Sequence, residues 1–382
     1  MWRTGKSFLL NSLLGLNGKP GSFVVGNTVN ACTKGLWLWG APVTLGDGLT
    51  VLFVDSEGLG STSRTQTEDC QIFSLAILLS SFFIWNSRGV IDGNALEDFA
   101  LVVNLTKHIH VRSSAESAAS PASGDQAALP VDFLHGRSRG GHDLATLADH
   151  FPSFLWVVRD FTLRLERNGR EIDDRQYLDE ALKPQKEAPK KNSSRNEIRK
   201  LLSTFFKARD CVTLVRPAED ESMLRNLAAQ PLDNLRPEFV KGLKILKKKV
   251  FGALRPKTLN GRLMSGPMLA TLAQTYSEAL NSGGVPTIST AWDRVLQNQA
   301  AESVARAAEV YMEHASWRFG LPASALLRLC AAVASAVHAG DEACTAELVH
   351  LDACKLPFEA ADFEAVHVQA RRAAISIFNG EL

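Results

Sequence analysis

The chain has 382 residues, of which 45% are hydrophobic and 22% are charged, and its formal net charge is +1 at pH 7. This balance excludes a disordered or fibrous protein, and the near-zero net charge argues against nonspecific binding to nucleic acid. A chain of this length usually forms two domains. One large and one small domain fit this length best.

The cysteines and the apolar stretches both favour a cytoplasmic protein. The six cysteines form no CxxC pair and have no histidine at metal-ligand spacing, which is typical of reduced thiols. The most apolar stretch, residues 72–85, is shorter than the roughly 18 residues that a membrane-spanning helix needs. It predicts a buried helix that runs into a buried strand.

In chain order, the first 20 residues predict a phosphate-binding turn that leads into a helix, because apolar residues fall at helical spacing after Ser7. Three short runs of β-branched and aromatic residues, 51–54, 82–85 and 154–158, predict parallel strands buried on both faces. Polar residues follow each run. Strands that alternate with helices indicate an α/β sheet, with ligands at the carboxyl ends of its strands.

The remaining segments predict loops and helices. Residues 112–149 are rich in Ala, Ser, Gly and Asp, which is typical of a surface insertion, and residues 183–195 read as a solvated loop. From residue 254 onward strand signals fade, and the alanine-rich segments 300–315 and 323–339 predict helices. Seven basic residues in 241–257 predict an exposed helix face, with contact to acidic lipid or a partner as the alternative.

The strongest single pattern is Arg3-Thr4-Gly5-Lys6-Ser7, which matches the end of the Walker A motif directly before the apolar helix. Backbone amides of such a loop bind phosphate oxygens together with the helix N-terminus. We expect Lys6 to reach the β- and γ-phosphates of a nucleotide and the Ser7 hydroxyl to bind Mg²⁺. The alternative for this segment is an ordinary helix N-cap.

A second turn supports the nucleotide-binding interpretation. Asp55-Ser56-Glu57-Gly58 follows a predicted strand at the distance expected of the second phosphate-sensing turn in P-loop GTPases. We expect Asp55 to hold Mg²⁺ through water and the amide of Gly58 to approach the γ-phosphate, since no side chain blocks it. Thr33 lies in a loop between the two turns and would be a further magnesium ligand. The alternative for that loop is a plain connection.

Several motifs in a fixed order resemble those of the guanylate-binding proteins, which are large, dynamin-related GTPases. They are residues 3–11 (RTGKSFLLN), 27–29 (NTV), 33–37 (TKGLW), 55–60 (DSEGLG), 72–76 (IFSLA) with 78–81 (LLSS), 158–161 (VRDF), 216–217 (RP), 235–239 (LRPEF), 260–261 (NG) and 266–268 (GPM). The resemblance covers essentially the whole chain apart from residues 112–149. It implies an α/β P-loop NTPase domain of the Ras-like kind over residues 1–252, followed by the start of an all-α helical domain over residues 253–382.

The resemblance also implies a role for each matching residue. Arg159-Asp160 matches the guanine-recognition pair, in which Asp160 accepts hydrogen bonds from N1 and N2 of the base. Arg3 matches an internal arginine finger that spreads charge on the transferred phosphate. The expected catalytic residues are Arg3, Lys6 and Glu57; the nucleotide-binding residues are Arg3, Thr4, Gly5, Lys6, Ser7, Phe8, Thr33, Asp55, Gly58, Arg159 and Asp160; the metal ligands are Ser7, Thr33 and Asp55.

The sequence departs from the family pattern in three ways. The first Walker A glycine and the strand before it would fall ahead of Met1, so we expect that the natural chain begins earlier. Ala31 stands where members with fast hydrolysis often carry serine, and Cys32 also differs, which weakens the expectation for positioning the attacking water but not for magnesium binding. The helical part is shorter than the family's stalk, so we expect a truncated C-terminal end as well.

The resemblance therefore implies a hydrolase that binds GTP and GDP, hydrolyses GTP to GDP with Mg²⁺ and forms a homodimer through its GTPase domains. Some relatives continue to GMP. One alternative is a nucleotide-binding interaction module with little turnover. Another is an atlastin-like membrane-remodelling GTPase, which would need transmembrane helices after the stalk. No nucleic acid is expected as a partner, and peripheral contact with membranes is the alternative to a purely cytoplasmic protein.

Overall fold

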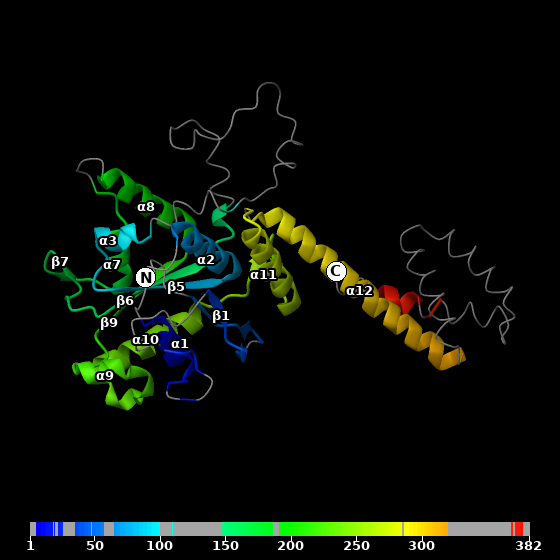
Figure 1. Cartoon of the computed structure of the whole chain (residues 1–382), viewed down its shortest axis with the longest axis horizontal. Helices are drawn as coiled ribbons and strands as arrows, with labels where there is room; N and C mark the ends of the chain where they lie inside the picture. The colour runs from blue at the N-terminus through cyan, green and yellow to red at the C-terminus, as the bar shows by residue number, and fades with distance from the viewer. Residues whose placement is uncertain are drawn as a thin grey trace, which may run out of the picture. The chain divides into compact units, whose positions relative to one another are not determined.

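A computed structural model describes residues 5–17, 19, 22–25, 35–46, 48–56, 65–99, 109, 147–185, 191–284, 286–319, 368–369 and 371–376 (Figure 1). The chain divides into two compact units, Met1–Ala291 and Trp292–Leu382. Nearly all of the expected insertion at 112–149, and the expected helix at 323–339, lie outside the described residues. The first unit contains all the strands described below.

The described elements alternate between helix and strand through most of the first unit. The strands are β1 (Leu36–Leu38), β2 (Val43–Thr44), β3 (Thr50–Val51), β4 (Val54–Ser56), β5 (Phe82–Arg88), β6 (Ser153–Arg159), β7 (Glu166–Arg167), β8 (Arg170–Glu171), β9 (Arg209–Leu214), β10 (Thr258–Leu259) and β11 (Arg262–Leu263). The helices are α1 (Lys6–Leu14), α2 (Gln66–Leu79), α3 (Gly93–Glu97), α7 (Asp174–Ala181), α8 (Lys191–Phe205), α9 (Glu221–Arg225), η1 (Leu227–Ala229), η2 (Leu232–Asn234), α10 (Pro237–Ala253), α11 (Gly266–Asn281) and α12 (Ile288–Phe319).

The centre of the first unit is a parallel sheet of β5, β6 and β9, with β6 in the middle. The register places Arg88 opposite Arg159 and Arg159 opposite Leu214, so the three strands end together. All residues of β6 after Ser153 are buried, because helices cover both of its faces. The predicted strands at 82–85 and 154–158 are thus confirmed, and each is longer than its apolar run.

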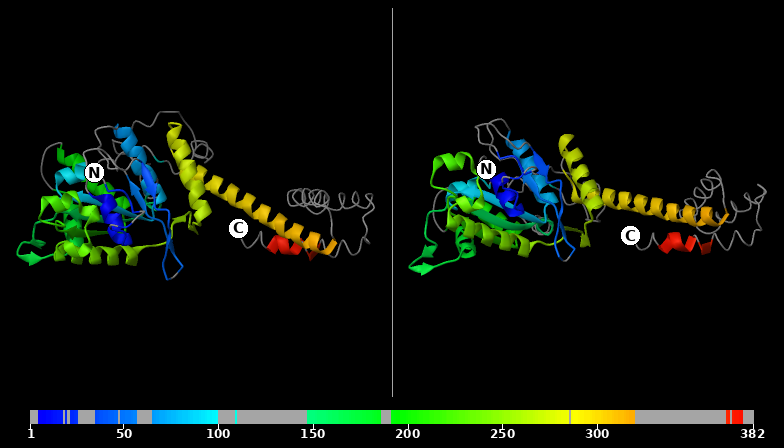
Figure 2. Two further views of the ribbon diagram at one scale, coloured as in Figure 1. Left: turned by 60° about the horizontal axis from the view of Figure 1, so that its bottom comes forward. Right: turned by 90° about the horizontal axis from the view of Figure 1, so that it is seen from below.

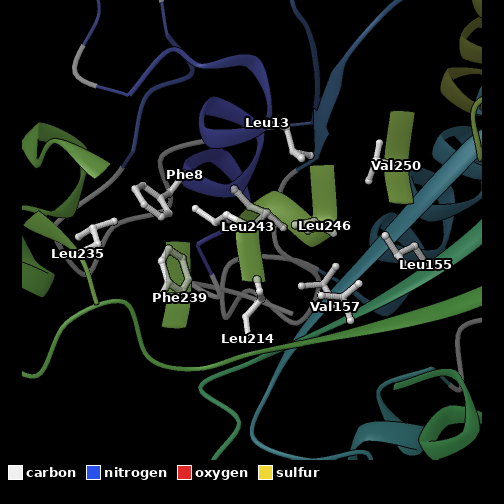
Figure 3. Close-up of a cluster of buried hydrophobic side chains, with 12 residues drawn as sticks. Phe8, Leu13, Leu155, Val157, Leu214, Leu235, Phe239, Leu243, Leu246 and Val250 are labelled. Atoms are coloured by element: carbon white, nitrogen blue, oxygen red, sulfur yellow. The ribbon is translucent and has the colours of Figure 1, made fainter. Parts of the chain in front are cut away.

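Helices α1 and α10 cover one face of this sheet, as the views in Figures 1 and 2 agree. Alternate β6 residues, Leu155 and Val157, point into this layer, as expected of a strand with a two-residue side-chain period. Figure 3 shows Phe8 of α1 beside Phe239 of α10, whose rings stack with centroids 6.3 Å apart. This packing fixes α1 against the sheet, and α1 begins at the predicted phosphate-binding turn.

The opposite face of the sheet is packed mainly by aromatic side chains. Phe154 and Trp156 of β6 point to this side, and Phe99 lies between them with ring centroids 5.6 and 5.4 Å away. Phe73 of α2 meets Phe99 edge-on, and Phe206, just after α8, packs on Phe154 at 4.6 Å. The predicted helix-to-strand transition within 72–85 is confirmed, since α2 ends at Leu79 and β5 begins at Phe82.

The strand that leads to Asp55 differs from the expectation. The apolar run 51–54 predicted one parallel strand buried on both faces, but β4 spans only Val54–Ser56 and pairs antiparallel with β1, and Val54 is 43% exposed. Of this run, Phe53 is the residue that is buried, against Phe251 of α10. The apolar run 51–54 therefore contains one inward-pointing residue, Phe53, and does not form a strand that is buried on both faces.

Two further segments differ from or refine the expectation. The loop expected over 183–195 becomes helical from Lys191, where α8 begins. The basic segment 241–257 contains α10, whose apolar face is buried. Four of its lysines, Lys241, Lys244, Lys247 and Lys248, are exposed, whereas Lys249 donates to the Asp210 carboxylate at 3.0 Å and to the Cys211 carbonyl at 2.9 Å.

The amino ends of the sheet strands lie beside Lys257, which follows α10. Its Nζ donates a 2.8 Å hydrogen bond to the carbonyl of Ser80, the C-cap residue of α2. Burial lowers the pKa of Lys257 to about 8. Burial, together with the nearby Lys257 charge, also lowers the pKa of His150 below its ordinary value.

After α10, the described chain consists of the β10–β11 hairpin and the helices α11 and α12, so the predicted change to helical structure is confirmed. In the first unit, α11 lies against α2. Among the described residues, no helix combines the length and the apolar character that crossing a bilayer requires.

Candidate functional site

The predicted phosphate-binding turn ends at the N-terminus of α1. Gly5 is the N-cap residue, with φ 76° and ψ 35°, and no side chain caps the helix there. The left-handed conformation suits glycine because other residues meet steric strain in it. The carbonyl of Gly5 accepts the first helical hydrogen bond, from the amide of Leu9 at 3.0 Å. A helix begun in this way directs its first amides and the positive end of its dipole towards an incoming anion.

Ser7, on the first turn of α1, contacts Asp55 of β4. The Ser7 Oγ donates a 2.5 Å hydrogen bond to Oδ2 of Asp55, which is 2% exposed. These residues are 48 positions apart in the chain, so the fold brings the two predicted phosphate-sensing turns together. The antiparallel pairing of Asp55 with Trp37 on β1 positions the carboxylate.

The chemistry of this pair fits a hard cation. Mg²⁺ prefers oxygen ligands and keeps several waters, so it does not need a full set of protein ligands. A hydroxyl can donate its proton to a carboxylate and still offer a lone pair to a metal. In the described part of the chain, no group of three or more His, Cys, Asp and Glu side chains is placed to hold a metal.

Arg159, the last residue of β6, lies beneath the turn. It is 5% exposed, and a Cβ placed on Gly5 would lie 3.3 Å from its Nη1. The guanidinium lies over the Phe239 ring, 5.4 Å from its centroid, while Nε and Nη1 have no hydrogen-bond partner among the described residues. Burial lowers the pKa of Arg159 to about 10, and the neighbouring Asp160 opposes this effect. The group stays positively charged at neutral pH.

Asp160 follows Arg159 and adopts a left-handed backbone, with φ 55°. Its carboxylate Oδ2 accepts a 3.0 Å hydrogen bond from Nε of Arg88, the last residue of β5. The Asp160 side chain is 27% exposed, so its carboxylate is accessible to a ligand. Asp160 and Arg88 thus stand side by side at the carboxyl ends of neighbouring parallel strands, where ligands bind in open α/β sheets.

The structure brings together six of the predicted site residues: Gly5, Lys6, Ser7, Asp55, Arg159 and Asp160. Lys6 is the first residue of α1 and is half-buried. The side chain of Phe8 points away from the turn into the core, where it is 1% exposed. The remaining predicted residues, Arg3, Thr4, Thr33, Glu57 and Gly58, lie outside the described residues.

Arg88 was not predicted from the sequence. The signal available was a basic residue at the carboxyl end of a predicted strand, but the apolar run appeared to end at Trp85. The structure extends β5 by three residues to Arg88. Asn11 was also missed: its side chain bonds the amide and carbonyl of Phe23 at 2.9 and 2.8 Å, which ties the following segment to α1.

Comparison with known proteins points in the same direction as this geometry. The family model "Guanylate-binding protein, N-terminal domain" matches residues 1–134 and 138–259, and "Guanylate-binding protein, C-terminal domain" matches residues 260–339. The chain is 36% identical over 332 residues to guanylate-binding protein 6 of Homo sapiens, covering 86% of this chain and 48% of that protein.

Two other relatives give similar values. Guanylate-binding protein 4 of Homo sapiens is 35% identical over 333 residues, with 86% of this chain and 48% of that protein covered. Guanylate-binding protein 2 of Rattus norvegicus is 34% identical over 331 residues, with 86% and 52% covered. The chain spans about half the length of the curated relatives it matches. With both domain models matched in order and a site of the expected kind at the sheet edge, the chain belongs to the guanylate-binding protein family.

Proposed function

We propose that this protein binds GTP with Mg²⁺ and hydrolyses it to GDP, and that two GTPase domains associate head to head during the reaction. The observation that carries this proposal is the hydrogen bond between Ser7 and Asp55 at the N-terminus of α1. It joins two motifs that are distant in sequence, and both are motifs that bind phosphate and its metal ion in P-loop proteins. The proposed catalytic unit is the large domain, residues 1–252, which contains every proposed site residue, and residues 253–382 form the helical domain.

In the proposed site, the amides at the start of α1 and the Lys6 ammonium bind the β- and γ-phosphates. Ser7 and Thr33 would hold Mg²⁺ directly and Asp55 through water, and the ion would neutralise charge on the phosphate oxygens. The buried charge of Arg159 lies under Gly5, so it stabilises the anion from the side opposite to solvent. The amide of Gly58 would approach the γ-phosphate, since glycine has no side chain to block it.

Recognition of guanine is assigned to Asp160. Its ionised carboxylate only accepts hydrogen bonds, and guanine presents two adjacent donors at N1 and N2, which adenine lacks. The partial exposure of this carboxylate at the end of β6 supports the assignment. Adenine offers no such pair of donors, so it loses both hydrogen bonds that the carboxylate makes to guanine and binds more weakly.

For hydrolysis, water attacks the γ-phosphorus and loses a proton to solvent, and the bond to the oxygen that bridges the β- and γ-phosphates breaks. GDP leaves with that oxygen, and the γ-phosphoryl group becomes inorganic phosphate. Arg3 supplies a positive charge to the phosphoryl group in the transition state, and Glu57 is the third proposed catalytic residue beside Lys6. Association of two GTPase domains would bring the arginine into place. The rate per molecule should then rise with protein concentration.

An assay of phosphate release from GTP, with and without Mg²⁺ and over a range of protein concentrations, tests this proposal. The wild-type protein should release phosphate only with Mg²⁺. Asp55→Asn should lose that activity, whereas Asp149→Asn, at an exposed carboxylate that pairs with Lys207, should retain it. Thermal melting of each variant shows whether it is folded.

GTP binding without turnover at every protein concentration would contradict hydrolysis. It would favour the interaction module instead, for which Ala31 and Cys32 in the loop before Thr33 are the supporting residues. The second alternative is an atlastin-like GTPase that remodels membranes.

Guanine recognition has its own test in Asp160→Asn. Xanthine carries a carbonyl at C2 where guanine carries an amino group, so an amide donor suits it better than a carboxylate. The variant should change the GTP-to-XTP preference by about 100-fold or more in favour of XTP, measured by titration of both nucleotides. A variant that binds GTP as tightly as the wild type would show that Asp160 does not read the base.

Peripheral contact with an anionic membrane is a separate proposal that rests on the four exposed lysines of α10, Lys241, Lys244, Lys247 and Lys248. Sedimentation with vesicles of anionic phospholipid tests it, with neutral vesicles as the control. Binding that disappears at high salt would support an electrostatic contact, and equal recovery with neutral vesicles would contradict it.

A further inference from the structure

Arg88 donates a hydrogen bond to the proposed base-recognising carboxylate, and neither motif matching nor the proposed mechanism uses it. Its Nε lies 3.0 Å from Oδ2 of Asp160, and its side chain is 63% exposed. Nη1 and Nη2 donate to no residue that the structure describes. Each of these groups therefore has hydrogen-bonding capacity available for a ligand, right beside the carboxylate.

The backbone holds the two side chains in register. Arg88 and Arg159 face each other across the parallel pair β5–β6, and the amide of Gly89 donates to the carbonyl of Arg159 at 2.7 Å. Gly89 has φ 83°, so the chain turns directly after Arg88 in a conformation that favours glycine. The amide of Phe161 in turn bonds the carbonyl of Leu214 at 3.0 Å. The ends of β5 and β6 are thus fixed, and only side-chain torsions remain free.

Together the two side chains offer a set of hydrogen-bonding groups that complements one edge of guanine. That edge carries an acceptor, O6, next to the donors N1–H and N2–H. A carboxylate accepts from both donors, and a guanidinium at its flank donates to O6. Each carboxylate oxygen has two lone pairs, so Oδ2 can keep the bond to Arg88 while it accepts one from the base. Adenine would place its N6–H donors against the guanidinium, where they find no acceptor.

We propose that Arg88 is a second guanine-recognition residue, which donates a hydrogen bond to O6 of the base whose N1 and N2 bind Asp160. The inference rests on the proposed function, because it needs Asp160 to be the carboxylate that reads the base. The Arg88 contact is to O6 of the purine ring, an atom that the Asp160 carboxylate does not contact. The ion pair itself is exposed, so its loss should change stability little.

To test this contact, the nucleotide and the protein are each changed at the proposed hydrogen bond, singly and together. The full chain is titrated at pH 7 with GTP and with 6-thio-GTP, in which a weaker sulfur acceptor replaces O6. The wild type should bind GTP about five- to tenfold more tightly than 6-thio-GTP, in line with the loss of one hydrogen bond to a charged donor. Arg88→Met should weaken GTP binding by a similar factor and bind the two nucleotides equally. Arg88→Lys should recover part of the preference.

Two further variants separate the possible causes. Arg167→Met removes an arginine of similar exposure on β7, which pairs with Glu180 of α7, and should keep the wild-type preference. If Arg88→Met also keeps that preference, Arg88 does not contact O6 and the inference is overturned. If Asp160→Asn leaves the GTP-to-XTP preference unchanged, the guanine site itself is wrong, and the role of Arg88 falls with it. Thermal melting of all variants shows that each is folded.

Discussion

Two cationic side chains, Lys257 and Arg159, lie at opposite edges of the β5–β6–β9 sheet and differ in their hydrogen-bond acceptors. At the amino edge, Nζ of Lys257 donates to the Ser80 carbonyl at the end of α2. At the carboxyl edge, Arg159 is 5% exposed, and its Nε and Nη1 have no hydrogen-bond partner among the described residues. Burial lowers the pKa of both groups, to about 8 for Lys257 and about 10 for Arg159.

The difference indicates which charge serves the fold and which serves a ligand. A buried donor with a protein acceptor stabilises the native state, and its removal leaves the acceptor unsatisfied. A buried guanidinium that has no acceptor among the described residues costs stability, and we propose that it serves the bound nucleotide instead. In this protein the second kind lies directly beneath the proposed phosphate-binding turn. Substituting each cation by methionine should therefore have opposite effects on stability.

Arg159→Met is expected to have the larger effect, which is on nucleotide binding. GTP affinity should fall roughly 10- to 100-fold, because the turn loses a charge-assisted contact. The free energy of unfolding without nucleotide should rise by about 1 kcal/mol, since methionine fills a similar volume without a charge to desolvate. Titration and urea unfolding measure the two quantities. A clear loss of stability would mean that the Arg159 charge is a structural partner in the free protein.

Lys257→Met should do the reverse when measured at pH 9, where most of the Lys257 amine is neutral and its burial no longer costs a charge. It leaves the Ser80 carbonyl without its donor, which should lower the free energy of unfolding by about 1 to 3 kcal/mol, while GTP affinity of the folded protein stays within about twofold. Lys248→Met, at an exposed lysine of α10, is the matched control and should change stability by less than about 0.5 kcal/mol. Urea unfolding of the three proteins checks this. Equal stability of the wild type and Lys257→Met would show that the hydrogen bond from Lys257 to Ser80 does not stabilise the fold.

The smallest expected effect is a pH dependence at the amino edge. The pKa of Lys257 is about 8 in the folded protein, below its ordinary 10.5. Between these values the unfolded chain holds a proton that the folded protein lacks, so stability rises with pH. From pH 7.5 to 9 the wild type should gain about 1 kcal/mol relative to Lys257→Met. His150, whose pKa is also lowered, contributes only below about pH 6.5, where its stability contribution falls as the pH falls. Parallel curves for the two proteins would show that Lys257 keeps its ordinary pKa.

The parts of the fold that could be predicted are those where one signal dominates. Continuous apolar runs predicted β5 and β6, and helical spacing predicted α1, because both signals are local. The strand at Asp55 was predicted to be parallel and buried on both faces, which is wrong. An apolar run does not show which of its residues points inward or which strand pairs with it. Among the described residues the partner of the strand at Asp55 is β1, which pairs with it antiparallel and not parallel as expected.

The site shows the same limit. The residue types in the motifs located Ser7, Asp55 and the Arg159-Asp160 pair, and the structure brings them together. Arg88 and Lys257 carry no motif, and their importance depends on contacts across 72 and 177 residues of chain. Such contacts come from strand register and from packing, which a single sequence does not encode locally. Arg88 can be recognised as a neighbour of the Arg159-Asp160 pair only when β5 and β6 are known to end together.

The long separation of the Lys257–Ser80 bond also affects how the protein emerges from the ribosome. The carbonyl at the end of α2 is synthesised 177 residues before the lysine that bonds it. At about 5 to 20 residues per second, this interval lasts roughly 9 to 35 s. During that time β5 has been made but the last turn of α2 and the sheet edge beside it lack their partner. The first unit, Met1–Ala291, therefore completes the hydrogen bonding at this edge only after most of its residues have been synthesised.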